Sequence, residues 1–303
     1  MLFDELNIGD NLVISNVLGG LGNQMFQYAA GRALALTNNR SLLLDLSGFT
    51  DYQLHHGFEL SRVFSLVATK AEPSTTHELL GWRENYWARK ILRRRQFAWL
   101  RGDKFVVEPY FNYWSDFFNL TGDCYLYGYW QSERYFKAVE SVIRQDFTFR
   151  EPLKEHNAEL ALEMASIQSV SLHVRRGDYV SNPKNHNIMS VCDLEYYRLA
   201  INYIATHVEQ PVFYLFSDDM AWVKQNLPME FPCIYIEHNG GAESYRDMQL
   251  MSLCCHHVIA NSSFSWWGAW LNSNPEKIVI APRKWFANGT NIKDLIPEGW
   301  ITL

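Results

Sequence analysis

Short apolar runs alternate with helical patterns along most of the chain. Runs at 11–17 and 41–46 predict two strands, and the apolar spacing between them predicts a helix. A strand-like run follows at 125–130. The second half repeats the pattern more clearly, with strands expected at 170–174, 211–216, 233–237, 257–260 and 278–281 and helices expected at 194–207, 245–254 and from 261 onward. Such an alternation predicts an α/β protein with parallel sheets of the doubly wound type.

The length of 303 residues exceeds that of one typical domain. The pattern turns polar between residues 147 and 156 and includes Pro152 there. We therefore expect two domains, residues 1–150 and 151–303, each with its own core.

The strand at 169–174 ends in His-Val-Arg-Arg-Gly-Asp-Tyr, residues 173–179. Alternation puts His173 and Arg175 on one face of the strand and three apolar side chains on the other. Guanidinium offers a planar fork of donors that fits phosphate oxygens, so the run predicts an anion site suited to a diphosphate. For Arg176 the favoured alternative is an ion pair with Asp178 that closes a surface turn.

Two further polar clusters follow predicted strands, where ligands of parallel sheets collect. Asp218 and Asp219 follow the run at 211–216, and a carboxylate such as Asp218 can accept two hydrogen bonds from guanine. The other cluster would present backbone N–H groups and hydroxyls to phosphate at a helix start. Each cluster could also be only a helix cap. The residues of the second cluster are Asn261, Ser262, Ser263, Phe264 and Ser265.

A glycine turn at residues 18–24 joins the first strand to the first helix. It matches neither the Walker A motif nor the full Gly-x-Gly-x-x-Gly pattern. Its glycines would allow a ligand to approach the backbone, with Asn23 and Gln24 offering amide groups. A tight turn in which Asn23 only caps the helix fits the spacing equally well.

The helix after Asn261 carries three tryptophans. Helical spacing predicts one core face, on which Gly268 would let a neighbouring strand come close. Trp266 and Trp270 lie off that face and could border a ligand, although packing is the default interpretation. The predicted core face consists of Phe264, Trp267, Gly268 and Leu271.

The segment from Arg83 to Lys104 is rich in arginine and aromatic residues. It suits peripheral contact with an anionic membrane or a polyanionic acceptor. The preferred interpretation is a solvated helix face on which arginine stems cover apolar neighbours.

Composition narrows the function classes. A formal charge of −6 argues against nucleic acid as the main partner. No apolar run is long enough to cross a bilayer, the N-terminus lacks signal-peptide features, and five cysteines form no Cys-x-x-Cys pair. We expect a cytoplasmic protein, with the inner face of the membrane as its only membrane contact. No Asp-x-Asp and no His/Cys cluster is present, so no metal is expected.

Four motifs in series, at residues 19–24, 173–179, 216–219 and 261–268, together resemble the alpha-1,2-fucosyltransferases of glycosyltransferase family 11, in their bacterial form. The resemblance implies a GT-B fold, in which two Rossmann-like domains face each other across a cleft. It also implies that residues 151–303 bind GDP-β-L-fucose and residues 1–150 bind the acceptor.

The resemblance also implies roles for single residues. Arg175 would hold the β-phosphate and stabilise the leaving GDP, His173 would contact the nucleotide, and Asp218 would read guanine. Two carboxylates, Asp178 and Glu133, are the candidates for a general base. The donor site would further include Asn261, Ser262, Ser263, Phe264 and Ser265, and the acceptor cleft would include Asn23, Gln24 and Trp130.

The implied reaction is a metal-independent, inverting transfer of L-fucose to the 2-hydroxyl of a terminal galactose on an oligosaccharide or a lipid-linked glycan. Gly20 stands where the related protein O-fucosyltransferases carry an arginine, which argues against a protein acceptor. Three alternatives stay open: another GDP-sugar donor, another fucose linkage, and a non-catalytic carbohydrate- or nucleotide-binding module.

Overall fold

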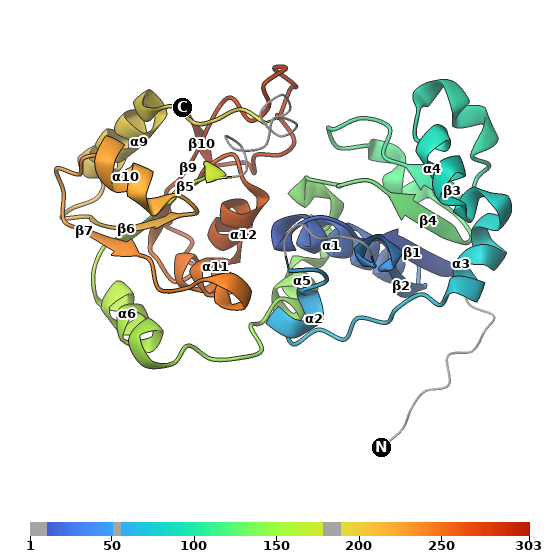
Figure 1. Cartoon of the computed structure of the whole chain (residues 1–303), viewed down its shortest axis with the longest axis horizontal. Helices are drawn as coiled ribbons and strands as arrows, with labels where there is room; N and C mark the ends of the chain where they lie inside the picture. Colours follow the sequence, from blue (N-terminus) through green and yellow to red (C-terminus); the bar gives the residue numbers. More distant parts are fainter. Residues whose placement is uncertain (1–10, 51–55, 178–188) are drawn as a thin grey trace. The chain divides into compact units, whose positions relative to one another are not determined.

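The chain forms two compact units, Met1–Thr148 and Phe149–Leu303, in a computed structural model that describes residues 11–50, 56–177 and 189–303 (Figure 1). Each unit contains one sheet of parallel strands flanked by helices. The predicted α/β class with two Rossmann-like units is therefore confirmed. The division lies close to the boundary predicted after residue 150, while the functions expected of the two halves stay predictions.

In unit 1 the strand order is β2-β1-β4-β3, and every neighbouring pair is parallel. On one face α1 packs closely, with Gly31 against Ser15 and Leu42. On the other face Ile14 and Leu43 form a core with residues of α3 and α4. The elements are β1 (Leu12–Asn16), α1 (Leu21–Thr37), β2 (Ser41–Asp45), α2 (Leu60–Val63), α3 (Pro73–Leu80), α4 (Tyr86–Leu92), β3 (Phe105–Val107), β4 (Cys124–Tyr127) and α5 (Glu140–Asp146).

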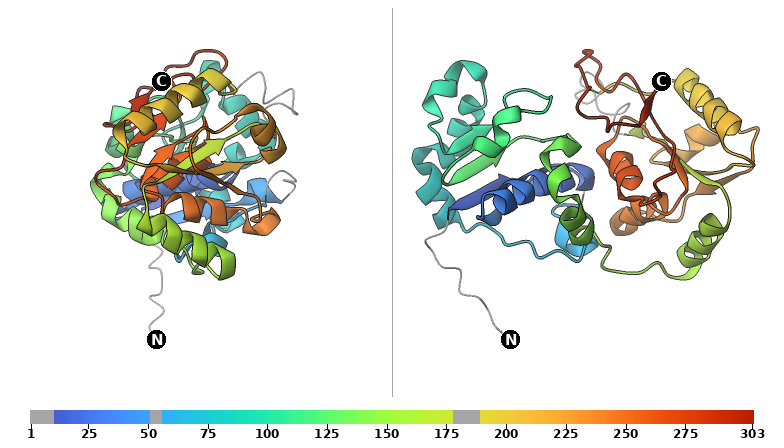
Figure 2. Two further views of the ribbon diagram at one scale, coloured as in Figure 1. Left: turned by 90° about the vertical axis from the view of Figure 1, so that its left-hand side faces the viewer. Right: turned by 180° about the vertical axis from the view of Figure 1, so that it is seen from behind.

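In unit 2 the strand order is β10-β9-β8-β5-β6-β7, again all parallel. Helix α9 covers one face of the sheet and α6 and α11 cover the other (Figure 2). The elements are α6 (Glu155–Ser166), β5 (Ser169–Val174), α9 (Leu194–His207), β6 (Val212–Ser217), α10 (Met220–Asn226), β7 (Cys233–Ile236), α11 (Tyr245–Met251), β8 (His256–Val258), α12 (Ser263–Leu271), β9 (Val279–Ala281) and β10 (Ile301–Thr302).

Short 3-10 helices connect these elements. In unit 1 they are η1 (Ser47–Phe49), η2 (Gly81–Glu84), η3 (Arg95–Leu100), η4 (Ser115–Asn119), η5 (Glu133–Tyr135) and η6 (Lys137–Val139), and in unit 2 the structure describes η7 (Gly241–Glu243).

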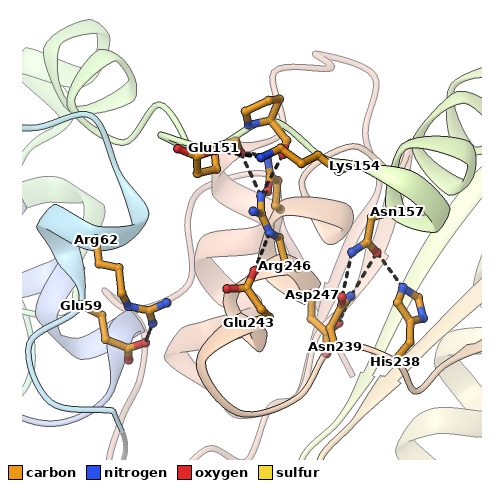
Figure 3. Close-up of polar contacts among 12 residues, drawn as sticks. Glu59, Arg62, Glu151, Lys154, Asn157, His238, Asn239, Glu243, Arg246 and Asp247 are labelled. Carbon is orange, nitrogen blue, oxygen red and sulfur yellow. Dashed lines mark hydrogen bonds and ion pairs between the residues drawn. The ribbon is translucent and has the colours of Figure 1, made fainter.

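Polar contacts tie the first segment of unit 2 to α11 and its preceding loop (Figure 3). Arg246 donates to the carbonyl oxygens of Glu151 and Pro152 and pairs with Glu243 at 3.0 Å. Asp247 accepts from Asn239 at 2.9 Å. Burial raises the pKa of the Asp247 carboxyl to about 7, so this anchor includes a carboxyl that titrates near neutral pH.

Three details differ from the sequence predictions. Strands β3 and β10 were not expected, and the run predicted at 125–130 ends at Tyr127. Gly268 lies against Met251, so it lets helix α11 approach rather than a strand. Trp266 and Trp270 are buried core residues, which confirms packing, the default interpretation, over the alternative of a ligand border.

Candidate functional site

The carboxyl edge of the unit 2 sheet brings three of the predicted residues together. In the parallel register His173 is paired with Phe216 and Val174 with Ser217, so the chain leaves both strands at neighbouring points. Arg175 Nη1 lies 3.1 Å from Asp218 Oδ2. The sequence predicted phosphate binding for Arg175 and guanine binding for Asp218, whereas the structure joins the two side chains as an ion pair.

Asp218 also shapes the turn that follows β5. Its Oδ1 accepts a hydrogen bond from the backbone N–H of Arg176 at 2.9 Å. A Cβ atom placed on Gly177 would lie 2.6 Å from Asp218 Oδ2. Only glycine at position 177 therefore leaves the carboxylate in its place, a role that the sequence analysis missed because the two residues are far apart in the chain.

Arg176 takes a structural position beside α10. Its guanidinium carbon lies 3.9 Å from the centre of the Trp222 ring, and its Nε lies 3.7 Å from Asp219 Oδ2. Asp219 in turn caps α10 by accepting from the Trp222 N–H at 3.2 Å. The predicted partner of Arg176, Asp178, lies outside the described residues, so the described contacts of Arg176 are with Asp219 and Trp222.

His173 is buried, and its Nδ1 has no hydrogen-bond partner among the described residues. Burial lowers the pKa of the imidazole to about 4; the Asp218 charge opposes this shift and the Arg175 charge adds to it. The ring is therefore neutral at pH 7 and lies 6.1 Å, centre to centre, from the ring of Phe264. A buried nitrogen without a partner is costly and marks a place where a ligand can supply the missing hydrogen bond.

The start of α12 divides into structural and exposed positions. Ser262 caps the helix by accepting from the Phe264 N–H at 3.3 Å, and the hydroxyl of buried Ser265 donates to the Ser262 carbonyl at 3.4 Å. Asn261 is fully buried and donates to the carbonyl oxygens of Ser190 and Trp285. The structure therefore does not support donor contact by Asn261 or Ser265; Ser263 and Phe264 are only half-buried.

The glycine turn of unit 1 is held together by its own amides. The N-cap of α1 is Gly20, without a side-chain cap, so the alternative in which Asn23 caps the helix is wrong. Asn23 instead accepts from Gln131 Nε2 at 2.8 Å. Gln24 is fully buried, donates to the carbonyl oxygens of residues 19 and 57 at 2.8 Å each, and accepts from the Glu59 N–H at 2.9 Å. Gln24 is thus a structural residue and not part of an acceptor surface.

Trp130 is also a core residue. Its side chain is fully buried and packs on Phe117 and Tyr135, with ring centres 5.0 and 5.5 Å away. Its backbone has a φ of +54°, which is unusual for a bulky residue. Neighbouring aromatic rings therefore cover the Trp130 ring, its Nε1 has no partner among the described residues, and its place in the acceptor cleft stays a prediction.

A carboxylate that the sequence analysis missed holds this unusual backbone. Glu108 follows β3 and accepts hydrogen bonds from the N–H groups of Tyr129 and Trp130 at 2.8 and 3.0 Å. Burial raises the pKa of Glu108 to about 7, and these two hydrogen bonds oppose the shift. The three-residue strand Phe105–Val107, which places Glu108 at the carboxyl edge of the unit 1 sheet, is too short for the sequence pattern to have indicated it.

The other base candidate, Glu133, lies in η5 and pairs with Lys137 at 3.3 Å. This pair is the i, i+4 arrangement common on helix surfaces. Nothing in its contacts distinguishes Glu133 as a base, and its catalytic role stays a prediction.

Within residues 11–50, 56–177 and 189–303, no group of three His, Cys, Asp or Glu side chains is arranged to hold a metal ion. Independence from metals stays a prediction. The helices of the described residues include none that is both long and apolar enough to span a bilayer.

The family model for glycosyl transferase family 11 matches residues 10–303. An alpha-1,2-colitosyltransferase of Escherichia coli is 37% identical, over 97% of this chain and 99% of that protein. A galactoside alpha-(1,2)-fucosyltransferase 2 of Bos taurus is 26% identical, over 88% of this chain and 70% of that protein. Among solved structures, the NodZ alpha-1,6-fucosyltransferase soaked with GDP-fucose shares the fold, with a TM-score of 0.54 at 17% identity over 88% of this chain and 97% of that one. With its motifs in the family's order and the family model matched from residue 10 to the last residue, the chain belongs to glycosyltransferase family 11.

Proposed function

We propose that this glycosyltransferase moves L-fucose from GDP-β-L-fucose to the 2-hydroxyl of a terminal galactose, with inversion and without a metal. The observation that carries the proposal is the polar group at the carboxyl edge of β5 and β6. There a buried His173 nitrogen, which has no hydrogen-bond partner in the described part of the chain, lies next to the Arg175–Asp218 ion pair. A guanidinium and a neutral imidazole in such a position suit a nucleoside diphosphate.

The chemistry is a single displacement. The acceptor oxygen forms a bond to the anomeric carbon while the bond from that carbon to the β-phosphate oxygen breaks, and the electron pair leaves with GDP. The acceptor proton passes to a base or to water. The task of the protein is then to stabilise the negative charge that develops on the departing diphosphate, which we assign to Arg175.

Asp218 would take part by holding Arg175. A carboxylate 3.1 Å from the guanidinium restricts its orientation and keeps the fork in place before the donor binds. This role competes with the guanine contact expected from the sequence, because one oxygen of Asp218 faces Arg175 and the other accepts from the Arg176 N–H. We therefore favour a positioning role for Asp218.

The remaining donor contacts would come from α12. The Ser262 hydroxyl already accepts a hydrogen bond from the Phe264 N–H. The N–H groups of the first helical turn and the Ser263 side chain are therefore the better candidates to bind phosphate oxygens. In unit 1 we retain Asn23, which is half-buried, as an acceptor residue.

A second donor has specific support. The similar E. coli protein is named an alpha-1,2-colitosyltransferase, and colitose is L-fucose without its 3-hydroxyl. The bovine relative is named for galactoside alpha-(1,2)-fucosyl transfer. A site that hydrogen-bonds the 3-hydroxyl would reject the deoxy sugar by a factor on the order of ten thousand, whereas a site without such a bond would accept both donors.

The test is transfer in the presence of EDTA. The purified chain is offered GDP-fucose or GDP-colitose with a panel of galactose-terminated glycans, and the linkage in the product is assigned by NMR. We expect α-1,2-fucosylated product and a large preference for GDP-fucose. A preference for GDP-colitose would show that colitose and not fucose is the donor sugar. Product that forms only after a divalent ion is restored would contradict metal independence. GDP binding without any product would favour a non-catalytic binding module.

A further inference from the structure

The segment of unit 1 that spans η2, α4 and η3 carries a strongly exposed aromatic surface. We call it the aromatic–arginine face. Large aromatic side chains that point into solvent together are unusual on a soluble domain and mark a contact surface. The exposed fractions are 56% for Trp82, 68% for Tyr86, 64% for Trp87, 46% for Ile91 and 79% for Trp99, and the cations among them are Lys90, Arg94 and Arg95.

Helix α4 divides this segment into an inner and an outer side. The inner side carries Leu92, which is buried against the sheet of unit 1, and Arg89, whose Nη1 lies 2.9 Å from Asp45 Oδ2. Positions 87, 90 and 91 share the opposite side of the helix at helical spacing, and Arg94 follows its C-cap. The helix is therefore fastened by one side, and its other side presents Trp87, Lys90 and Ile91 to solvent.

The segments on both sides of α4 are fixed to it by arginines that point inward. Arg83 donates to the Leu100 carbonyl at 2.8 Å, and Arg101 donates to the Leu92 carbonyl at 2.7 Å. These bonds connect η2, α4 and η3 into one small substructure beside β3 (Figure 1). The exposed aromatics are thus held on a preformed surface.

Arg83 lies over the exposed Trp82 ring at 5.1 Å, so the sequence interpretation, in which basic side chains cover apolar neighbours, holds for part of this face. Arg94 and Arg95 are exposed and form no ion pair with the described residues, and Lys90 lies beside the Trp87 ring at 5.2 Å. The acidic residues of segment 83–104 are Glu84 and Asp103, and Glu84 pairs with His77. The aromatic–arginine face is therefore cationic on a chain whose formal charge is −6.

We propose that the aromatic–arginine face docks the protein on a bilayer of anionic phospholipid. Tryptophan and tyrosine side chains partition to the headgroup level, and lysine and arginine bind the phosphate layer. A protein partner would have to match four exposed aromatic rings by shape, whereas a bilayer accepts them in any arrangement. The proposal does not depend on the identity of the donor sugar; it adds that a lipid-linked glycan would be met at the same surface.

The test measures binding of the full chain to vesicles. Vesicles of phosphatidylcholine with phosphatidylglycerol are compared with phosphatidylcholine alone by co-sedimentation at low and high salt. We expect binding that requires the anionic lipid and weakens as salt rises. The Arg94→Glu/Arg95→Glu variant should bind at least about thirtyfold more weakly, which corresponds to about 1 kcal/mol for each cation near the surface. The matched control is Arg283→Glu/Lys284→Glu, two exposed neighbouring cations of unit 2, which should bind as wild type.

Insertion of the aromatic side chains has its own readout. Brominated lipid should quench the tryptophan fluorescence of wild type, and Trp82→Ser/Trp87→Ser/Trp99→Ser should lose the quenching and bind about tenfold more weakly or worse. Leu162→Ser, at an exposed leucine of α6, is the control for removing apolar surface elsewhere. Equal binding to vesicles without anionic lipid, unchanged binding of both variants, or tighter binding to heparin than to vesicles would overturn the proposal. Circular dichroism and turnover on a soluble acceptor establish that the variants are folded.

Discussion

The two sheets end in similar turns, but the polar side chains at these turns are used differently. At the end of β1 the buried amide of Gln24 makes three hydrogen bonds to backbone groups, and Asn23 bonds to Gln131. At the end of β5 the buried His173 has a nitrogen that no described residue pairs, and the charged Arg175 follows two residues later. The last residue of β1, Asn16, also has a buried side-chain oxygen without a partner among the described residues, so what distinguishes the β5 edge is the charged pair beside its imidazole.

The same contrast extends to the carboxylates. Glu108 in unit 1 accepts two backbone hydrogen bonds and fixes an unusual backbone at Trp130. Asp218 in unit 2 accepts one backbone hydrogen bond and reserves its other oxygen for Arg175. Similar strand–turn–helix units thus carry a structural carboxylate in one case and a carboxylate that orients a charged side chain in the other.

The largest expected effect is on catalysis. Arg175→Ala should lower kcat/KM by about a hundredfold or more, because a contact to developing negative charge is lost. The measurement is a donor-saturation series with GDP-fucose, with circular dichroism as the check on folding. Arg198→Ala, at an exposed arginine of α9, is the control and should behave as wild type. Near wild-type turnover of Arg175→Ala would show that Arg175 has a structural role only, like the polar side chains at the β1 edge.

At the β1 edge the expected effect is on stability. Gln24→Ala should lower the free energy of unfolding by about 3 kcal/mol, because several buried backbone groups lose their partners. Urea denaturation measures it. Unchanged stability combined with a raised KM for the acceptor would contradict this structural role and would support the acceptor contact that the sequence predicted for Gln24.

His173 should make the β5 edge sensitive to acid. Its pKa of about 4 in the folded chain lies below the ordinary value of 6.5, so its contribution to stability is complete above pH 6.5 and declines as the pH falls toward 4. Between pH 7.5 and 5 this loss amounts to about 2 kcal/mol. His173→Gln should reduce the pH dependence of urea unfolding by that amount, and an unchanged dependence would contradict a buried neutral imidazole.

The smallest effect tests the turn itself. Gly177→Ala should displace the Asp218 carboxylate, since the new Cβ would lie 2.6 Å from Oδ2, and should lower kcat by about tenfold through misorientation of Arg175. Gly240→Ala is the matched control, because nothing lies within 4 Å of the Cβ position at that glycine. If both variants had wild-type kcat, Asp218 would have no positioning role.

The sequence predicted most of the fold because its strands are buried and apolar. Helix α9 was predicted with the bounds that the structure gives, 194–207, and β5 and β6 within a residue or two. Strands β3 and β10 were missed because runs of three and two residues carry almost no periodic signal.

The site was predicted in part, and the errors have a common cause. His173 lies at the end of β5, and Arg175 and Asp218 directly follow β5 and β6, whose carboxyl ends meet at one edge, so topology alone gathers them. Gln24 and Asn261 were assigned to ligands, but each is buried and satisfied by neighbours distant in the chain. Side-chain burial of that kind depends on tertiary contacts that local sequence patterns do not encode.

The ion pair between Arg175 and Asp218 has a consequence for selectivity among anions. The guanidinium faces a negative charge 3.1 Å away, so the local field that a passing inorganic phosphate or sulfate ion meets is weak. A small anion gains little by displacing a carboxylate that is held in place. A larger ligand that also reaches the His173 nitrogen and the first turn of α12 gains contacts there, and these offset its competition with Asp218 for the Arg175 guanidinium. The pair would thus favour a nucleoside diphosphate over inorganic phosphate at the proposed donor site.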